Sequence, residues 1–540
     1  MKSTRYSFLI PLFLVILFFL LVAPGIRWGV PGQWHPDELI KKVDNALAGR
    51  EQFDTVNFDY PSLPKYIMLV VSKAAIALGA QRAGIMLAAR LASVVLGALC
   101  VLLAYAITRR MGGSPLAGGL AGLLVISSSE MALNARFAHN DIYLAFFTSL
   151  TAFSLVSFWR TRNKLWLYFA FLCVGFSASS KYNGASLIVA PLVVYLLAQL
   201  GTYKKNLLNI FETLFIGLAL SGAGYVIGTP RAILAMRFYF ENALPAIFRH
   251  ASYDRQPGDL IGFAGQWQVL VGALGLLAFV FFLGAVAWFA VRAILLAARK
   301  IDEDPQKIRM ALILLGVIVL CDLPIMLSYN YQPRFFLPML PLLACLAALW
   351  VEDLYTIGKR RGQVWAARLA IAAALVVVGA GLVRDASIFL LFQNDARLPA
   401  SEFIKTLPKE SSIEFTLYPP TLPVKYFAAK HAYPIFFKKF PDQVPPVSED
   451  YPYNQGEAGL QARRTDYLVI DSFTYERFAD DYLCQNHLVE CRFFQRLRSG
   501  QTSYERIASF HYDLPAFLPD LSPAFVNPTI EVYQRKPANP

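Results

Sequence analysis

Long apolar segments recur along this chain and restrict its possible folds more than any other feature. A membrane-spanning helix needs about 20 predominantly apolar residues. The sequence contains eleven candidates, at residues 7–26, 84–108, 115–131, 142–159, 165–180, 184–200, 208–228, 268–297, 310–328, 335–356 and 366–388. Only 16% of the 540 residues are charged, well below the roughly 25% of ordinary soluble domains. We therefore predict a polytopic α-helical membrane protein with about eleven transmembrane helices.

The first apolar segment follows Lys2 and Arg5 and is long enough to span the membrane. It lacks a convincing small-residue cleavage site, so we expect a retained helix with a cytoplasmic N-terminus. Residues 66–80 form a shorter apolar segment interrupted by Lys73. We interpret that segment as a helix lying at the membrane interface.

The distribution of basic residues predicts the orientation of the spans. Lys and Arg are concentrated in alternate loops, which the positive-inside rule assigns to the cytoplasm. These loops are residues 108–113, 159–164, 202–206, 298–309 and 358–363. We attribute the net charge of +13 to this asymmetry, and we expect no nucleic-acid partner. The predicted location is the inner or plasma membrane, in contact with its lipids.

The character of the chain changes after residue 390. Short segments at 412–418, 465–473 and 528–536 are typical of strands, and residues 401–408 are typical of a short helix ended by proline. We therefore predict two domains. A membrane domain of residues 1–390 precedes a small extracytoplasmic α/β domain of residues 391–540.

Two cysteines lie in the polar C-terminal region, whereas the other four lie within apolar segments. The spacing of Cys484 and Cys491 does not match a CxxC metal motif. If this domain is outside the cytoplasm, the two residues could form a disulfide.

Acidic and basic residues converge on the outer membrane face from four separate loops. The sequence HPDE contributes His35, Asp37 and Glu38, and NARFAHND contributes Arg136, His139 and Asp141. Further side chains come from the first outer loop, from SSKYNG and from YQPRFFLP; they are Tyr60, Lys65, Lys181, Tyr182 and Arg334. Carboxylates can accept protons, and Lys and Arg bind anions. The combination is typical of an active site at the interface.

Each of these residues also has a purely structural interpretation. Lys and Arg near helix ends often extend toward lipid headgroups. Asp141, or the Asp37–Glu38 pair, could instead cap a helix. The occurrence of all these residues on one face favours the functional interpretation.

The motifs resemble those of GT-C class glycosyltransferases, specifically the protein O-mannosyltransferases and the lipid A aminoarabinose transferases. The resemblance rests on HPDE after the first span, YPSLPKY in the first outer loop, RFAHNDIYLAFF, SKYNG and PRFFLPMLPLLA. These occur in the family's order over roughly residues 1–390.

The resemblance implies an inverting transfer of a sugar from a polyprenyl-phosphate donor to a protein, lipid or glycan acceptor. Asp37 would be the general base, while Glu38 and Asp141 would shape the site or bind a divalent metal ion. Lys181 and Arg334 would contact the donor phosphate. The remaining substrate-binding candidates would be His35, Tyr60, Lys65, Arg136, His139 and Tyr182. Neither the sugar nor the use of a metal follows from the motifs.

Two other classes of protein are considered. A secondary transporter also carries charges in its membrane domain, but an inverted repeat with broken helices near the midplane is typical of such proteins. A non-catalytic membrane protein could use its C-terminal domain for binding. Neither class requires acids and bases to converge from four loops.

The charge pattern predicts that reporter fusions after Arg160 and after Ala400 will lie on opposite sides of the membrane, because basic loops are retained in the cytoplasm. A phosphatase active only outside the cytoplasm and a fluorescent protein active only inside it can be fused at both positions. The same side for both fusions would contradict the orientation.

Overall fold

The computed structural model describes residues 8–49, 58–200, 203–252, 258–299, 305–421, 456–462 and 464–537. Parts of the predicted loops at 202–206 and 298–309, and residues 422–455 of the predicted C-terminal domain, lie outside these ranges. The chain divides into two compact units. Unit 1 comprises Met1–Ile26 and Asp37–Ala386, and unit 2 comprises Arg27–Pro36 and Ser387–Pro540.

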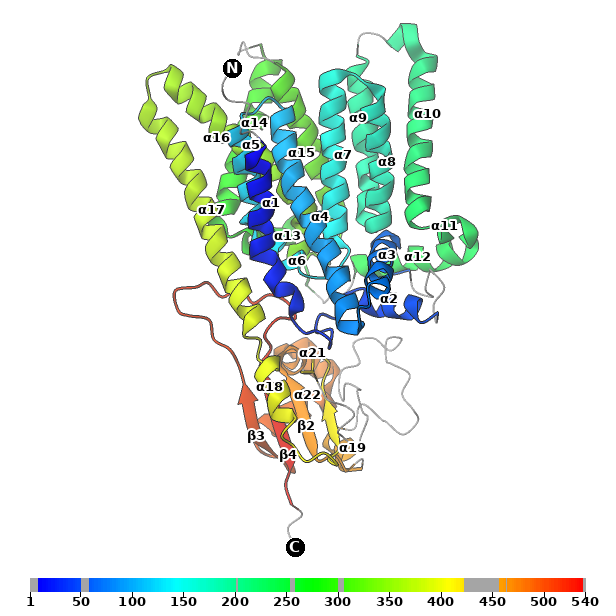
Figure 1. Cartoon of the computed structure of the whole chain (residues 1–540), viewed down its shortest axis with the longest axis vertical. Coiled ribbons are helices and arrows are strands. Elements are labelled where there is room, and N and C mark those ends of the chain that lie inside the picture. The colour runs from blue at the N-terminus through cyan, green and yellow to red at the C-terminus, as the bar shows by residue number, and fades with distance from the viewer. Residues whose placement is uncertain are drawn as a thin grey trace. The chain divides into compact units, whose positions relative to one another are not determined.

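Unit 1 is a bundle of long apolar helices (Figure 1). Its α-helices are α1 (Leu9–Val22), α2 (Ile40–Leu47), α3 (Leu63–Ala77), α4 (Arg82–Arg110), α5 (Pro115–Ile126), α6 (Ser129–Asn134), α7 (Asp141–Thr161), α8 (Lys164–Ser180), α9 (Val189–Ala198), α10 (Tyr203–Gly228), α11 (Arg231–Leu234), α12 (Met236–Ala251), α13 (Gly262–Leu274), α14 (Leu276–Ala297), α15 (Pro305–Met326), α16 (Leu340–Arg360) and α17 (Val364–Gln393). Short 3₁₀ helices are η1 (Ala23–Arg27), η2 (Tyr182–Ile188) and η3 (Pro333–Met339). The last residue of η1 and the part of α17 from Ser387 onward belong to unit 2.

The helices confirm the predicted fold class. Among the described residues, 8 helical segments are long and apolar enough to cross a membrane. Shorter apolar helices at Pro115–Ile126, Lys164–Ser180 and Tyr182–Ala198 correspond to the remaining predicted spans. The segment predicted to lie at the interface is α3, a helix of 15 residues.

Burial distinguishes the centre of the bundle from its periphery. In α7, 78% of the apolar window is buried, and the η3–α16 segment has the same value. The corresponding value is 22% for the first span and for α14. The central helices α7 and α16 therefore pack against protein on most sides, and each begins close to a polar motif identified in the sequence.

Several short helices gather at one end of the bundle. Figure 1 shows α2, α3, α11 and α12 together at this end, where α7 also begins. The backbone N–H of Leu39 donates to the carbonyl of Ala138 over 2.9 Å, which joins two loops that are far apart in the sequence. The polar loops thus meet at the end of unit 1 where α7 starts.

Unit 2 contains a four-stranded sheet with the order β1-β2-β4-β3. Its strands are β1 (Ile413–Phe415), β2 (Tyr467–Asp471), β3 (Tyr504–Phe510) and β4 (Ile530–Arg535). Strand β1 pairs parallel to β2, while β4 is antiparallel to both β2 and β3. The helices are α18 (Arg397–Ile404), α19 (Gly456–Ala462), α20 (Ser472–Tyr475), η6 (Glu476–Ala479), α21 (Asp481–Asn486) and α22 (Leu488–Arg498).

Both faces of this sheet are covered. Leu468 and Ile470 of β2 belong to one buried cluster, together with Phe494 of α22. The alternate residue Val469 belongs to a second cluster on the opposite face, together with Ile404 of α18. Side chains alternate between the faces of a strand, so β2 is the buried centre of an α/β domain. The predicted disulfide between Cys484 and Cys491 is present.

The short segment Arg27–Pro36 packs with unit 2, although the sequence placed it in the membrane domain. The indole N–H of Trp28 donates to Asp395 over 2.9 Å. The Arg397 guanidinium lies 5.0 Å from the Trp28 ring and 4.5 Å from the Trp34 ring. These cation–π contacts and the hydrogen bond explain the difference, because they join residues too distant in sequence for a local pattern to reveal.

Candidate active site in the ion cluster of unit 1

The carboxylate of Asp141 is the centre of a buried ion cluster. Asp141 is the first residue of α7, where the helix dipole favours a negative charge. One carboxylate oxygen lies 2.6 Å from Nζ of Lys181, and the other lies 2.8 Å from Nδ1 of His139. The side chain of Asp141 is 1% exposed. A carboxylate so deeply buried requires such partners, because desolvation of an unpaired charge is costly.

Lys181 reaches the cluster because the chain changes direction at this residue. It follows the last residue of α8 and has an extended backbone conformation before η2 begins. Its ammonium group also lies 3.8 Å from the centre of the Phe335 ring, a cation–π contact. Burial lowers the pKa of Lys181, while the neighbouring Asp141 carboxylate acts in the opposite direction.

Arg334 connects the buried carboxylate to a more accessible one. Its Nη1 lies 2.8 Å from Asp37, and its Nε lies 3.7 Å from Asp141. The Asp37 side chain is 32% exposed, compared with 13% for Arg334. Asp37 is therefore the carboxylate of this cluster that external molecules can reach most readily.

Aromatic rings border the charged groups. The Tyr60 ring stacks on His250, with a centroid separation of 5.3 Å, and it meets the His139 ring edge-on at 5.8 Å. Nζ of Lys42 lies 5.8 Å from the same tyrosine ring. Burial raises the pKa of Tyr60 and lowers that of His250. Both shifts favour the uncharged forms of Tyr60 and His250 beside the ion cluster.

Glu38 occupies a different environment from its neighbour Asp37. Its two oxygens accept hydrogen bonds from Nε and Nη2 of Arg90, each over 2.7 Å, and both side chains are fully buried. The carboxylate also accepts a hydrogen bond from the backbone N–H of Ala138 over 2.9 Å. Arg90 in turn donates to the carbonyl of Ile26. These contacts show that Glu38 joins three segments, and its expected part in shaping the site or binding a metal ion stays a prediction.

Two other candidates from the sequence contact different groups. Arg136 is buried and donates to the carbonyls of Leu21 and Val22 near the end of α1. His35 belongs to unit 2, where its ring contacts Phe525 at 5.0 Å. These contacts favour structural roles for Arg136 and His35.

Lys65 and Tyr182 lie in unit 1, and each contacts residues other than those of the ion cluster. Lys65 is buried in α3, with its Nζ 5.4 Å from the Tyr66 ring. The Tyr182 hydroxyl donates to the carbonyl of Phe58 over 2.8 Å. Tyr182 thus supports the loop that carries Tyr60.

The sequence reasoning missed Arg90, His250 and Phe335 as components of this region. Arg90 sits within the first long span after the outer loop, and a charged residue inside an apolar helix is a signal of a buried partner. His250 gave no such signal, because it lies in the polar end of α12, far in sequence from the other motifs.

The described residues contain no group of three or more His, Cys, Asp or Glu side chains arranged to hold a metal ion. Both metal candidates from the sequence have basic partners instead. Glu38 is paired with Arg90, and Asp141 is paired with Lys181. The charges of these two carboxylates are thus balanced by protein groups.

Comparison with known structures identifies the class to which this fold corresponds. The structure resembles that of ArnT from Cupriavidus metallidurans bound to undecaprenyl phosphate, with a TM-score of 0.52 and 15% identity over 98% of each chain. It also resembles the archaeal oligosaccharyltransferase AglB from Archaeoglobus fulgidus in complex with an inhibitory peptide and a dolichol-phosphate. For that pair the TM-score is 0.52 and the identity 12%, over 99% of this chain and 89% of the other. The fold is therefore that of the GT-C proteins.

A family match makes the assignment more specific. Residues 82–243 match the family described as dolichyl-phosphate-mannose-protein mannosyltransferase. No curated protein sequence matches the chain significantly. The match covers less than a third of the chain and agrees with the predicted enzyme class, a mannosyltransferase-like glycosyltransferase in a multi-pass membrane fold. This class argues against the transporter and the non-catalytic alternatives.

The pairing of Glu38 with Arg90 predicts that Glu38→Gln will lower the stability of the protein. The substitution leaves the Arg90 charge buried without its carboxylate, and breaking a buried pair in this way costs about 3–5 kcal/mol. Thermal unfolding of the purified protein in nanodiscs measures the effect.

Asp44→Asn provides a matched control, because Asp44 forms a more exposed ion pair with Arg82 at 3.4 Å. We expect this control to change stability by less than about 1 kcal/mol. If Glu38→Gln unfolds at the same temperature as the control but loses activity, Glu38 has a catalytic role after all.

Proposed function

We propose that this protein transfers a sugar from a polyprenyl-phosphate donor to an acceptor hydroxyl at the outer face of the membrane. The observation that carries this proposal is the chain of ion pairs from Asp141 through Arg334 to Asp37. It combines a partly exposed carboxylate with a guanidinium that can also bind an anion. A glycosyl transfer from a phosphate leaving group requires both chemistries.

Asp37 is the proposed general base. Its proximity to Arg334 favours the ionised carboxylate, which is the form that accepts a proton. In the transfer, the acceptor oxygen forms a bond to the anomeric carbon while the bond from that carbon to the phosphate oxygen breaks. Asp37 takes the hydroxyl proton, and the polyprenyl phosphate leaves with the bonding electron pair. A single displacement of this kind inverts the anomeric configuration.

Arg334 is the proposed contact for the donor phosphate. Its planar fork of N–H donors suits phosphate oxygens, and its position beside Asp37 would bring the leaving group close to the base. Lys181 is buried against Asp141, so we propose that it holds Asp141 and adds positive potential at the same place. Asp141 would then orient Arg334.

Tyr60, His139 and His250 are proposed to border the bound sugar. Both histidine rings contact the Tyr60 ring next to the charged groups, and aromatic faces can pack against the apolar face of a sugar ring. In this proposal the three rings contact the sugar and take no part in the proton transfer to Asp37.

The proposed orientation places the N-terminus in the cytoplasm and the C-terminal domain outside it, in the inner or plasma membrane. Two observations support it. The five basic loops alternate along the chain as the positive-inside rule requires. The Cys484–Cys491 disulfide is characteristic of an oxidising compartment.

The donor class is supported by the relatives, whose structures contain undecaprenyl phosphate or dolichol-phosphate. Lipid-linked donors also suit a reaction outside the cytoplasm, where nucleotide sugars are absent. A protein, a lipid or a glycan could supply the acceptor hydroxyl.

Asp37→Asn should reduce turnover by about 10²–10⁴-fold, the usual contribution of a general base. The amide keeps the shape of the side chain but cannot take the proton. Release of polyprenyl phosphate from a panel of undecaprenyl-phosphate-linked sugars measures the rate. Asp44→Asn serves as the control with an intact cluster. Full activity of Asp37→Asn would contradict its role as the base.

Arg334→Lys should raise the donor KM by roughly 10- to 150-fold, which corresponds to about 1.5–3 kcal/mol for a charge-assisted hydrogen bond. The positive charge is retained, so a loss would come from the missing fork geometry. The measurement is the donor dependence of the same assay. An unchanged KM would indicate that Arg334 only balances Asp37 and Asp141.

A further inference from the structure

A long connection in unit 2 joins two strands that are direct neighbours. Strand β3 ends at Phe510, and β4 begins at Ile530 beside it in antiparallel register. Such neighbours need a hairpin loop of only about 2–5 residues. The connection of residues 511–529 is much longer than strand pairing requires, and long loops within compact domains are usually either functional or disordered.

This connection has a fixed conformation near its C-terminal end. The Asp395–Arg397 ion pair is fully buried, and both residues bind the loop. Asp395 accepts a hydrogen bond from the backbone N–H of Asn527 over 2.7 Å, and Arg397 donates to the carbonyl of Phe525 over the same distance. Phe525 and Asn527 have φ angles of 66° and 56°, a conformation that non-glycine residues adopt at a cost. The buried ion pair stabilises it.

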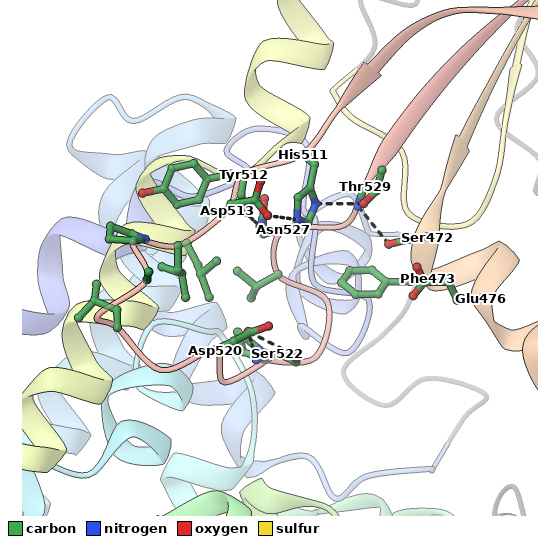
Figure 2. Close-up of a pocket in the computed structure, with 17 residues that line it drawn as sticks. Ser472, Phe473, Glu476, His511, Tyr512, Asp513, Asp520, Ser522, Asn527 and Thr529 are labelled. Atoms are coloured by element: carbon green, nitrogen blue, oxygen red, sulfur yellow. Dashed lines mark hydrogen bonds and ion pairs between the residues drawn. The ribbon is translucent and has the colours of Figure 1, made fainter.

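The connection encloses a pocket of about 390 Å³ together with the start of α20 and η6. Figure 2 shows His511 between Thr529 and Asp513, with Phe473 and Glu476 on the same side of the pocket as Thr529. The His511 ring lies 3.0 Å from the Thr529 hydroxyl and 3.2 Å from the Asp513 carboxylate. The volume falls at the lower end of the roughly 300–1,000 Å³ typical of ligand pockets.

The lining combines two kinds of surface. Carboxylates come from Glu476, Asp513 and Asp520, whereas Phe473 and several aliphatic side chains provide apolar area. Among the described residues that line the pocket there is no lysine or arginine. A phosphorylated or acidic ligand would therefore meet carboxylates without a compensating cation.

We propose that this pocket binds a short neutral saccharide. A pyranose has hydroxyl groups around its edge and C–H groups on its face, so it matches a pocket with carboxylate acceptors and an aromatic ring. The small volume suits a short saccharide rather than an extended chain. The inference is independent of the proposed glycosyl transfer, because none of these residues belongs to the ion cluster of unit 1.

The test measures binding of mannotriose to the full-length protein in nanodiscs, which avoid detergents that carry sugar headgroups. Phe473→Leu removes the aromatic face but keeps an apolar side chain, and Glu476→Gln removes one carboxylate. Each should weaken binding at least fivefold while thermal unfolding stays near wild type. Phe517→Leu is the matched control, because Phe517 lies in the same loop, is 82% exposed and does not line the pocket. It should bind mannotriose like the wild type.

Asp37→Asn should also bind mannotriose normally, so failure of the catalytic proposal would leave this result unaffected. Neutral-saccharide binding should change little between 50 and 500 mM NaCl, since screening acts on charged ligands. Two results would overturn the inference. One is no saturable binding of mannotriose, chitotriose or maltotriose. The other is binding of trilysine alone with loss at high salt, which would show that the pocket recognises positive charge.

Discussion

The burial of Asp141 is the constraint on which the rest of the site depends. Its carboxylate begins a helix that is surrounded by protein, at a place where an unpaired charge would be strongly unfavourable. His139 therefore contacts it from the same loop, and Lys181 and Arg334 come to it from two other segments. Once Arg334 is held in this way, its second partner Asp37 has a defined position near the protein surface.

Two adjacent carboxylates consequently have different surroundings. Glu38 is completely enclosed by Arg90 and the backbone of Ala138, and it fastens the first outer loop to α4 and to the loop before α7. Asp37 faces Arg334 and keeps part of its surface accessible. The buried carboxylate holds the loop that carries the accessible one, which suits the role of general base that we propose for Asp37.

Unit 2 repeats the same physical principle with different residues. The buried Asp395–Arg397 pair fixes the backbone of the β3–β4 connection. In the short segment that follows the first span, Trp28 donates to Asp395 and the Trp34 ring contacts Arg397. In both units a buried ion pair holds loops whose own sequences do not specify a conformation. The residues left accessible beside these pairs are the ones for which we propose binding or catalysis.

The sequence by itself determined the membrane class, the positions of the spans and the central strands of the small domain. Each depends on local hydrophobic periodicity, as in the apolar segment of α7 or the buried strand Tyr467–Asp471. The motifs also identified Asp37, Asp141, Lys181 and Arg334 as candidates. Only the tertiary structure decided that Glu38 pairs with Arg90, that Arg136 binds the end of α1, and that His250 joins Tyr60. These pairings depend on which segments approach each other in space, and local patterns of hydrophobicity and charge do not specify contacts between distant segments.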